Sequence, residues 1–377
     1  DDVGIVPLRQ LYTFPTVNYF ELRDGLRRRD PDAEPRVLLL ANGTYDLATL
    51  AAQVDDPAVL ERSSDGVYTS HLPIYVAPTA TLVVEGVELR LSAPGVAAVI
   101  YRGDLFVVDA RVTSWDPAAG DYGPRPELGK DEALLYGRQA PRPYLLGLRG
   151  SRSYFANSEF HGLGYQGRSS SFGVSLAARL SPEAQRDDNT LRNTVANLPR
   201  PTGVLIGNTV SRAFFGFFTN NSGPVLLLGN VFRDNVIYNV DPHDFSDGLT
   251  IVRNITLGAR FKHGIILSRE VQGALIAENV STLNHGSGVM LDRDSGDATI
   301  RDNLVFANSG DGIAVFESDS DRLYDNLVFA NDNDGIYIRN SRHVRVEGNT
   351  IDGNGHYGVE VATADLTADQ GRDFALD

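Results

Sequence analysis

One short segment of the chain places three polar side chains where neighbouring segments are apolar. Asp241, His243 and Asp244 form the sequence Asp-Pro-His-Asp. A histidine flanked by carboxylates has a partner that fixes its tautomer and a pKa near neutrality, and a general base requires both. Arg269 and Arg293 follow Asp244 at spacings of 25 and 24 residues, and arginine binds anionic groups through a planar fork of donors. These residue types predict a histidine base beside a site for an anion.

Two reactions without a metal suit such residues. A proton next to a carboxylate is weakly acidic because its removal gathers a second negative charge, and a cation held on that carboxylate offsets the charge. A uronic acid polymer presents such a carboxylate in every sugar. Glycoside hydrolysis instead needs two carboxyl groups across the scissile bond, and composition leaves it open because Asp241, Asp244 and Asp292 could supply them.

A repeat in the sequence brings these side chains together. Asparagine recurs every 23 to 25 residues, and most of these asparagines are followed by a second one five residues later. The first series is Asn230, Asn254, Asn279, Asn303, Asn326 and Asn349, and the second is Asn235, Asn284, Asn308, Asn331 and Asn354. A glycine then opens a short apolar run in most units, as in Gly264-Ile-Ile-Leu. A repeat of this length with short β-rich runs is typical of a solenoid.

The pattern within each unit predicts which side chains face outward. Residues one and three positions after the glycine are apolar, whereas those two and four positions after it vary and are often polar. Alternation along a strand sends the first set to a dry interior and the second outward. With rungs about 4.8 Å apart, one outward patch is predicted to comprise His243, Arg269, Asp292 and Arg293. Tyr238 comes just before the strand of His243, and Lys262 and His263 come just before the next strand.

The predicted fold is all-β, a right-handed parallel β-helix, because parallel crossovers are nearly always right-handed. We expect an irregular N-terminal cap with some helix over residues 1–35, the β-helix catalytic domain over 36–362, and a polar tail over 363–377 that caps the last rung. Residues 115–145 and 179–201 are expected to leave the solenoid. A leucine-rich repeat has a similar period, but its Leu-x-x-Leu-x-Leu spacing does not recur.

The bulk composition excludes several classes of function. The formal net charge is −15, so a nucleic acid would be repelled. There are no cysteines, which removes disulfides and thiolate catalysis, and no apolar run is long enough to span a bilayer. The chain does not begin with Met and shows no signal peptide, which fits a processed or trimmed amino terminus. We expect no cofactor and no metal.

The stretch from Asn230 to Arg293 resembles the mannuronan C-5-epimerases of the alginate pathway, in particular the periplasmic, calcium-independent kind. The motifs that carry the resemblance are Gly229-Asn-Val-Phe-Arg-Asp-Asn, Asp241-Pro-His-Asp, Lys262-His-Gly-Ile-Ile-Leu-Ser-Arg-Glu and Ser287-Gly-Val-Met-Leu-Asp-Arg. Weaker matches extend it over most of the chain. The resemblance implies a periplasmic or secreted enzyme that acts on an anionic polysaccharide, with proteins of an alginate-secretion complex as possible partners.

The resemblance also implies a role for each candidate residue. His243 is the base, Arg269 neutralises the sugar carboxylate, and Tyr238 or a water returns a proton to the opposite face. Asp241 and Asp244 orient His243 and tune its basicity. The remaining candidates, which would bind substrate, are Lys262, His263, Asp292, Arg293 and Arg339.

Some residues depart from the family pattern, and two rival functions stay open. Asn239 stands where the family usually has glycine and Phe172 where tyrosine is common, and we expect both to alter the sugar-binding surface. The calcium-binding nonapeptide repeats of secreted relatives do not occur in this sequence, and we expect the further carbohydrate-binding segment of some family members to be missing. A lyase would share the proton abstraction and then expel the neighbouring sugar. A non-catalytic solenoid would bind the polymer and leave every sugar unchanged.

Overall fold

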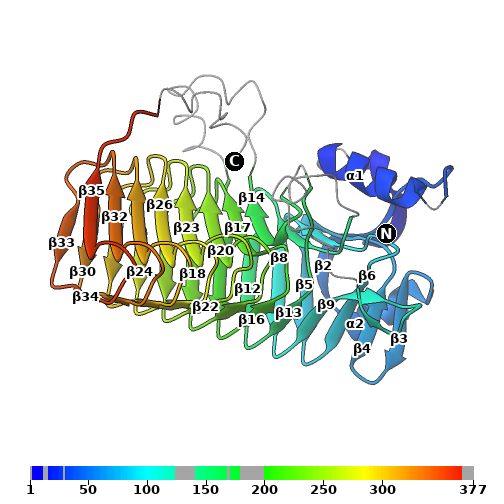
Figure 1. Cartoon of the computed structure of the whole chain (residues 1–377). Coiled ribbons are helices and arrows are strands. Elements are labelled where there is room, and N and C mark those ends of the chain that lie inside the picture. The colour runs from blue at the N-terminus through cyan, green and yellow to red at the C-terminus, as the bar shows by residue number, and fades with distance from the viewer. Residues whose placement is uncertain are drawn as a thin grey trace.

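The computed structural model describes residues 2–11, 16–28, 30–123, 141–167, 170–178 and 199–366. Within these ranges the chain winds into an elongated coil of short parallel strands, with the N-terminal region at one end and β35 (Val359–Ala362) at the other (Figure 1). Large parts of the two expected excursions, and residues 367–377 of the tail, lie outside the described residues. The prediction of an all-β parallel β-helix is confirmed.

Each regular turn of the coil contributes one strand to each of three parallel ladders. Ladder A carries the candidate site. Its strands are the first part of β2 (Arg36–Asp46), the first part of β5 (Ile74–Glu85), β7 (Val99–Tyr101), β11 (Leu145–Gly147), β14 (Gly173–Ala177), β17 (Phe215–Asn220), β20 (Val240–His243), β23 (Ile265–Ser268), β26 (Val289–Asp292), β29 (Ile313–Phe316), β32 (Ile336–Arg339) and β35.

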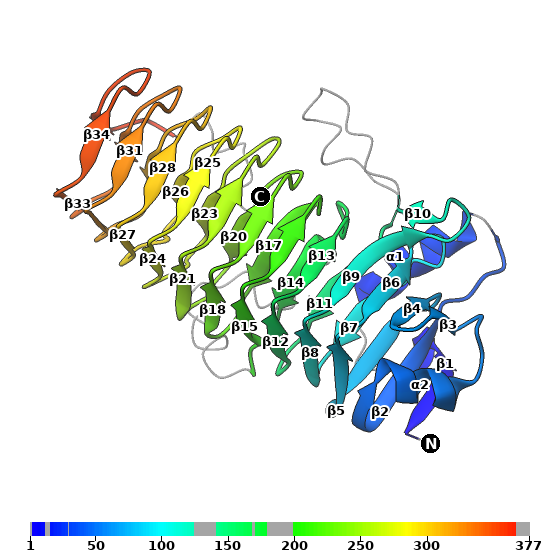
Figure 2. The ribbon, with the colours of Figure 1, turned by 90° about the horizontal axis from the view of Figure 1, so that it is seen from below.

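The other two ladders close the coil. Ladder B contains the second parts of β2 and β5, β8 (Asp104–Val108), β12 (Arg152–Ala156), β15 (Thr202–Ile206), β18 (Val225–Leu228), β21 (Leu249–Val252), β24 (Leu275–Ala277), β27 (Thr299–Arg301), β30 (Arg322–Tyr324) and β33 (Arg345–Glu347). Ladder C contains β4 (Val67–Ser70), β6 (Glu88–Ser92), β9 (Arg111–Asp116), β13 (Glu159–His161), β16 (Thr209–Ser211), β19 (Val231–Arg233), β22 (Ile255–Leu257), β25 (Val280–Thr282), β28 (Leu304–Phe306), β31 (Leu327–Phe329) and β34 (Thr350–Asp352). The regular spacing of these rungs is visible from below (Figure 2).

The predicted alternation of faces is confirmed in ladder A. Val240, Ile265 and Leu267 are fully buried inside the coil, and they belong to one apolar core that runs through its length. In the last rung, by contrast, Val361 is 73% exposed. Burial of these branched side chains is the main favourable contribution to the stability of such a coil.

The repeated asparagines form two buried ladders at the turns. In the first, Nδ2 of Asn230 donates to Oδ1 of Asn254 at 2.9 Å, and Nδ2 of Asn254 donates to Oδ1 of Asn279 at 3.0 Å. The same amide oxygens accept backbone N–H groups of the preceding rung, as between Asn230 and Asn254 at 2.9 Å. Each rung is thereby fixed in register with the next, which is the condition for aligning residues far apart in sequence.

The N-terminal region is more regular than expected. It contains β1 (Val3–Pro7), which pairs antiparallel with β2, the 3-10 turn η1 (Leu8–Gln10) and α1 (Thr16–Arg27). A second helix, α2 (Leu47–Val54), follows β2 and is capped by Asp46, whose side chain accepts the N–H of Thr49 at 2.7 Å. Next to it, β3 (Leu60–Ser64) pairs antiparallel with β4, and β10 (Asp121–Tyr122) pairs antiparallel with β9.

The start of the C-terminal tail continues the last rung. Ala364 exchanges two hydrogen bonds with the side chain of Asn340, at 2.9 and 3.0 Å. The two residues are 24 positions apart, which is one turn of the coil, so Ala364 still stacks on the preceding rung. Beyond β35 the chain runs back above the coil in the view of Figure 1. The expectation that the tail caps the last rung stays a prediction, because residues 367–377 lie outside the described residues.

Candidate active site

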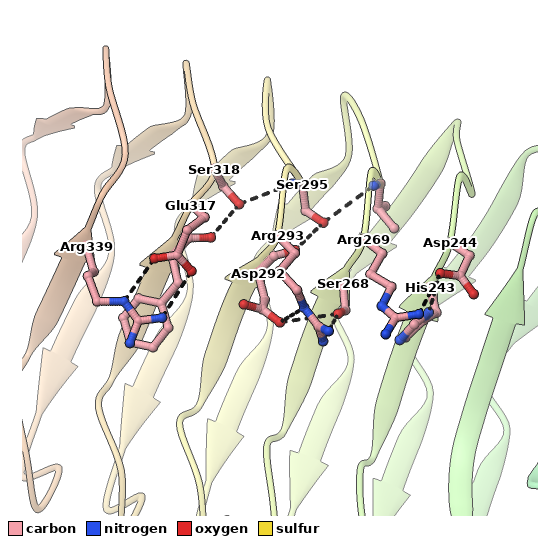
Figure 3. Close-up of polar contacts among 12 residues, drawn as sticks. His243, Asp244, Ser268, Arg269, Asp292, Arg293, Ser295, Glu317, Ser318 and Arg339 are labelled. Atoms are coloured by element: carbon pink, nitrogen blue, oxygen red, sulfur yellow. Dashed lines mark hydrogen bonds and ion pairs between the residues drawn. The ribbon is translucent and has the colours of Figure 1, made fainter. Parts of the chain in front are cut away.

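The candidate site lies on the outward face of ladder A, where strands far apart in the sequence are in register. His243 pairs with Ser268, Ser268 with Asp292, Asp292 with Phe316, and Phe316 with Arg339. Their side chains follow one another along the coil axis (Figure 3). The predicted positions of His243 beside Ser268 and Asp292 are confirmed.

A second column of side chains arises from the turn that follows each of these strands. Asp244, Arg269, Arg293 and Glu317 all have left-handed backbones, with φ of 38°, 65°, 52° and 48°. Such a conformation is uncommon for residues other than glycine and costs about 1–3 kcal/mol each. The turn directs these charged groups along the edge of the face that carries His243.

Asp244 links the histidine to the arginine of the next rung. Its Oδ1 lies 3.1 Å from Nδ1 of His243 and 3.7 Å from Nη1 of Arg269. Nδ2 of Asn220 donates to its Oδ2 at 2.5 Å. A carboxylate beside Nδ1 favours the tautomer with the proton on that nitrogen, and Nε2 is then able to accept a proton. The geometry is that of a base, its orienting carboxylate and an adjacent cation.

Asp241 is the most deeply buried acid of the site. Its exposed fraction is 2%, and Oδ1 has no hydrogen-bond partner among the described residues. Burial raises the pKa of this carboxyl to about 7, and His243 opposes the rise. The charge beside His243 therefore changes with pH near neutrality.

We expect Asp241→Asn to stabilise the fold, by a margin that grows between pH 3.8 and about 7. The folded chain, with a pKa of about 7 against 3.8, binds more protons in this range than the unfolded chain, so the native protein loses stability as pH rises. The complete shift corresponds to about 4 kcal/mol, and an amide avoids it. Thermal unfolding of both proteins across this range measures the margin. If the difference in stability between the two proteins did not change with pH, Asp241 would not carry a buried charge in the folded protein.

Arg293 and Asp292 form a network one rung beyond Arg269. Nε of Arg293 lies 2.7 Å from Oδ2 of Asp292, and Nη2 of Arg293 donates to Oγ of Ser268 at 2.9 Å. Ser268 also donates to Oδ2 of Asp292 at 3.3 Å. These contacts hold the guanidinium of Arg293 against Ser268, which belongs to the rung next to that of His243.

Tyr238 lies at the other end of β20 from His243. Its ring stacks on His263 with centroids 5.9 Å apart and meets Phe215 edge-on at 5.1 Å. It also packs against the apolar cluster of Ile266, Met290 and Ala314 on the outward face of ladder A. A tyrosine in this position has a fixed ring. The sequence placed His263 on the rung next to Tyr238, but it did not show the contacts with Phe215 and the apolar cluster.

His263 is a neutral imidazole in this setting. Its Nδ1 accepts the backbone N–H of Ser287 at 2.9 Å. Burial, with a smaller effect of the adjacent Lys262, lowers its pKa to about 3. Any contact of His263 with a sugar carboxylate would therefore be a hydrogen bond from Nε2, while positive charge at this edge comes from Lys262.

Arg339 lies four rungs from His243, about 19 Å at the rung spacing. Both Nε and Nη2 contact the carboxylate of Glu317, each at 3.0 Å. Its guanidinium also lies 4.0 Å from the centroid of the Phe316 ring. Sequence reasoning missed Glu317 and Asn220, although extending the two columns by one rung in each direction would have found both.

The two departures from the family pattern have different structural consequences. Phe172 joins an aromatic cluster, with ring centroids 4.7 Å from Phe215 and 4.9 Å from Phe218, and Phe218 lies 5.9 Å from the His243 ring. Asn239 is fully buried. The expectation that Asn239 alters the sugar-binding surface is wrong, because its side chain points into the second asparagine ladder.

No group of three or more His, Cys, Asp or Glu side chains in the described part of the chain is arranged to hold a metal ion. None of the described helices is long and apolar enough to cross a membrane.

Fold and site together define a parallel β-helix with a histidine–carboxylate–arginine site on one outward sheet face. The family described as "Periplasmic copper-binding protein (NosD)" matches residues 242–367, which are mainly regular rungs. A crystal structure of the periplasmic alginate epimerase AlgG superposes with a TM-score of 0.85 at 28% identity, covering 100% of this chain and 84% of that one.

Sequence relatives agree with this structural similarity. A mannuronan C5-epimerase of Pseudomonas aeruginosa is 36% identical over 252 residues, which is 66% of this chain and 42% of the relative. One of Pseudomonas putida is 33% identical over 290 residues, which is 76% of this chain and 52% of the relative. The chain thus spans about half the length of the curated relatives it matches. The resemblance to mannuronan C-5-epimerases that the motifs indicated is confirmed.

Proposed function

We propose that this chain converts mannuronate to guluronate at carbon 5 within polymeric alginate. The observation that carries the proposal is the approach of His243 and Arg269 to the same carboxylate oxygen of Asp244, at 3.1 and 3.7 Å. The names of the relatives and of the solved structure support the same chemistry. The substrate is an anionic polysaccharide, and no cofactor takes part.

In the proposed reaction Nε2 of His243 takes the proton from carbon 5, and the electron pair of the broken C–H bond moves into the adjacent carboxylate. Arg269 stabilises the second negative charge that develops there. Asp244 stabilises the imidazolium that forms, in the way that an orienting carboxylate does beside a general base. A proton delivered to the opposite face of carbon 5 completes the epimerisation, and His243 returns its proton to solvent.

The proton donor is Tyr238 or a water molecule. Tyr238 is held by Phe215 and His263, which suits a fixed donor. It stands at the far end of β20 from His243, however, and a water could reach the opposite face of the sugar directly. Lys262, Arg293 and, at greater distance, Arg339 bind carboxylates of neighbouring sugars, while Asp292 positions Arg293.

Proton spectra of polymannuronate after incubation with the protein test the proposed activity. We expect guluronate signals to grow at the expense of mannuronate, equally with and without a chelator. A lyase would produce ultraviolet-absorbing unsaturated chain ends instead, and a binding protein would leave the spectrum unchanged. Either of these results would replace the epimerase proposal.

Replacing Arg269 by Gln should lower kcat about 10²- to 10³-fold, the usual loss when one charge-stabilising donor is removed. Glutamine is shorter but polar and suits the partly exposed position of Arg269, so the rung should stay folded. Arg269→Lys should recover part of the rate, since charge is retained and the forked geometry is lost. Rates of guluronate formation measure the effect. Equal rates for wild type and Arg269→Gln would mean that another group neutralises the carboxylate.

The proposed location is the periplasm or the outside of the cell, where the substrate polymer is made accessible. Proteins of an alginate-secretion complex are the partners that fit this location. The similarity to a periplasmic alginate epimerase supports this location.

A further inference from the structure

The outward face of ladder A is obstructed on one side of His243. In the rung before it, Phe218 stands next to Asp241 and Asn220 stands next to His243. Their exposed fractions are only 4% and 8%. Phe218 belongs to a buried cluster that fills this part of the face, together with Phe172, Phe214, Phe215, Val236 and Ile237.

Helix α1 covers the same face further toward the N-terminus (Figure 1). Leu22 of α1 is fully buried in a cluster with the outward residues Ile100 and Leu146. Polar contacts fix the helix there: Nδ2 of Asn18 donates to the hydroxyl of Tyr144 at 3.0 Å. The protein itself thus occupies the face of ladder A on this side, where a polymer would otherwise lie.

On the other side of His243 the outward residues Ile266 and Met290 are also only 5% and 9% exposed, but charged side chains reach the surface beside them. The side chain of Arg293 is 14% exposed and that of Arg339 is 24% exposed. Between them Phe316 is half-buried, with its ring 5.0 Å from that of Tyr337 and edge-on to it. An aromatic ring offers contact with the apolar face of a sugar, and the guanidinium groups offer contact with carboxylates.

The stretch with these charged side chains has an acidic end. Tyr337 is followed in the next rung by Glu360. A hydrogen bond with Asp334, followed by burial and the charge of Asp334, raises the pKa of Glu360. Asp292 and Glu317 within the stretch are each paired with an arginine, whereas Glu360 and Asp334 share a hydrogen bond with each other. This acidic end therefore disfavours a further anionic sugar, and the favourable positions lie between β20 and β32.

We propose that the polymer binds asymmetrically, with the reacting sugar at one end of the occupied stretch, over β20, and the other bound sugars over β23 to β32. This inference rests on the proposed function. The stretch from His243 to Arg339 covers four rungs, about 19 Å. Sugars beyond the reacting one, on the side of Phe218, leave the sheet face because α1 and the aromatic cluster occupy it.

Oligomannuronates of defined length, labelled at the reducing end and incubated in deuterated water, test the asymmetry. Tandem mass spectrometry locates the deuterium that enters at carbon 5. We expect exchange concentrated near one chain end, and near the same end for every length. Exchange spread evenly over the inner sugars would overturn the proposed asymmetric binding but leave the proposed function standing. Absence of exchange in polymer and oligomers would overturn the proposed function, and the asymmetry with it.

A pair of phenylalanine variants provides an independent check. Phe316→Ala should lower kcat/KM about three- to tenfold on oligomers that reach β29, and should leave the shortest active oligomer unaffected. Phe329→Ala, on ladder C, removes a ring that stacks on Phe306 at 5.1 Å. This variant should leave kcat/KM unchanged on both long and short oligomers. Equal loss on short and long oligomers, or no loss on long ones, would contradict binding over Phe316.

Discussion

Replacing His243 by Gln should lower the rate of hydrogen exchange at carbon 5 by about 10²- to 10⁴-fold, the usual contribution of a positioned general base. Glutamine fills a similar volume, so the contacts of Asp244 with Asn220 and Arg269 should survive. The affinity for polymannuronate should change little, because the sugar carboxylates are proposed to bind Arg269, Lys262 and Arg293 and not His243. Exchange rates in deuterated water and binding isotherms separate the two effects.

A matched control is His285→Gln, which changes an exposed histidine two rungs further along the coil, at a turn. This variant should keep the wild-type rate. If His243→Gln exchanged as fast as His285→Gln, the base would be a different residue. If His243→Gln lost binding and exchange in equal measure, the histidine would hold the substrate rather than take its proton.

The second large effect concerns stability, and it depends on Asn239 and Ala259. The second asparagine ladder lacks an amide where Ala259 stands. Asn239 supplies it: Nδ2 of Asn235 donates to Oδ1 of Asn239 at 2.8 Å, and Nδ2 of Asn239 donates to Oδ1 of Asn284 at 2.9 Å. In other rungs glycine takes this place because an asparagine presses against it; a Cβ at Gly264 would lie 2.6 Å from Nδ2 of Asn284.

We therefore expect Asn239→Gly to destabilise the protein by about 2–4 kcal/mol, through lost hydrogen bonds and an internal space. Ala259→Asn alone should cost about 1–3 kcal/mol, since two amides would compete for one space. The double variant recreates the glycine–asparagine pair of the other rungs and should recover to within about 1 kcal/mol of wild type. Denaturant unfolding of the four proteins measures this coupling. If the losses of stability in the two single variants simply added in the double variant, Asn239 would not be replacing the asparagine that position 259 lacks.

The repeat made much of the site predictable. His243 and Ser268 meet because one turn of the coil separates them and strand alternation sends both outward. The same reasoning placed Arg269 beside Asp244, which the contact of 3.7 Å between them matches. Two periodicities in the sequence were sufficient to predict these positions. One is the number of residues in a turn of the coil, and the other is the two-residue alternation of side chains along a strand.

Other features depend on side-chain packing that no period encodes. Asp241 titrates near neutrality because the rungs on either side bury it, and its neighbour Phe218 belongs to a rung with a different motif. The pairing of Arg339 with Glu317 depends on side-chain torsions. For Asn239 the sequence did hold a signal, because Ala259 stands where the repeat has asparagine. Only the structure shows that the side chain of Asn239 fills this place in the buried asparagine ladder.

Helix α2 was also not predicted from the sequence. Residues 47–54, Leu-Ala-Thr-Leu-Ala-Ala-Gln-Val, are good helix formers that follow an aspartate suited to cap them. Asp46 does cap α2. The prediction of β-rich sequence from residue 36 onward overlooked this local signal because the neighbouring runs are apolar and short.

The most direct test of the account follows each hydrogen at carbon 5 during conversion of polymannuronate in deuterated water. If the imidazole of His243 removes that hydrogen and the opposite face receives a new one, each guluronate formed will carry one deuterium at carbon 5, and unsaturated ends will stay at background. The proposed mechanism would be contradicted if guluronate kept its original hydrogen at carbon 5. It would also be contradicted if each loss of that hydrogen produced an unsaturated chain end.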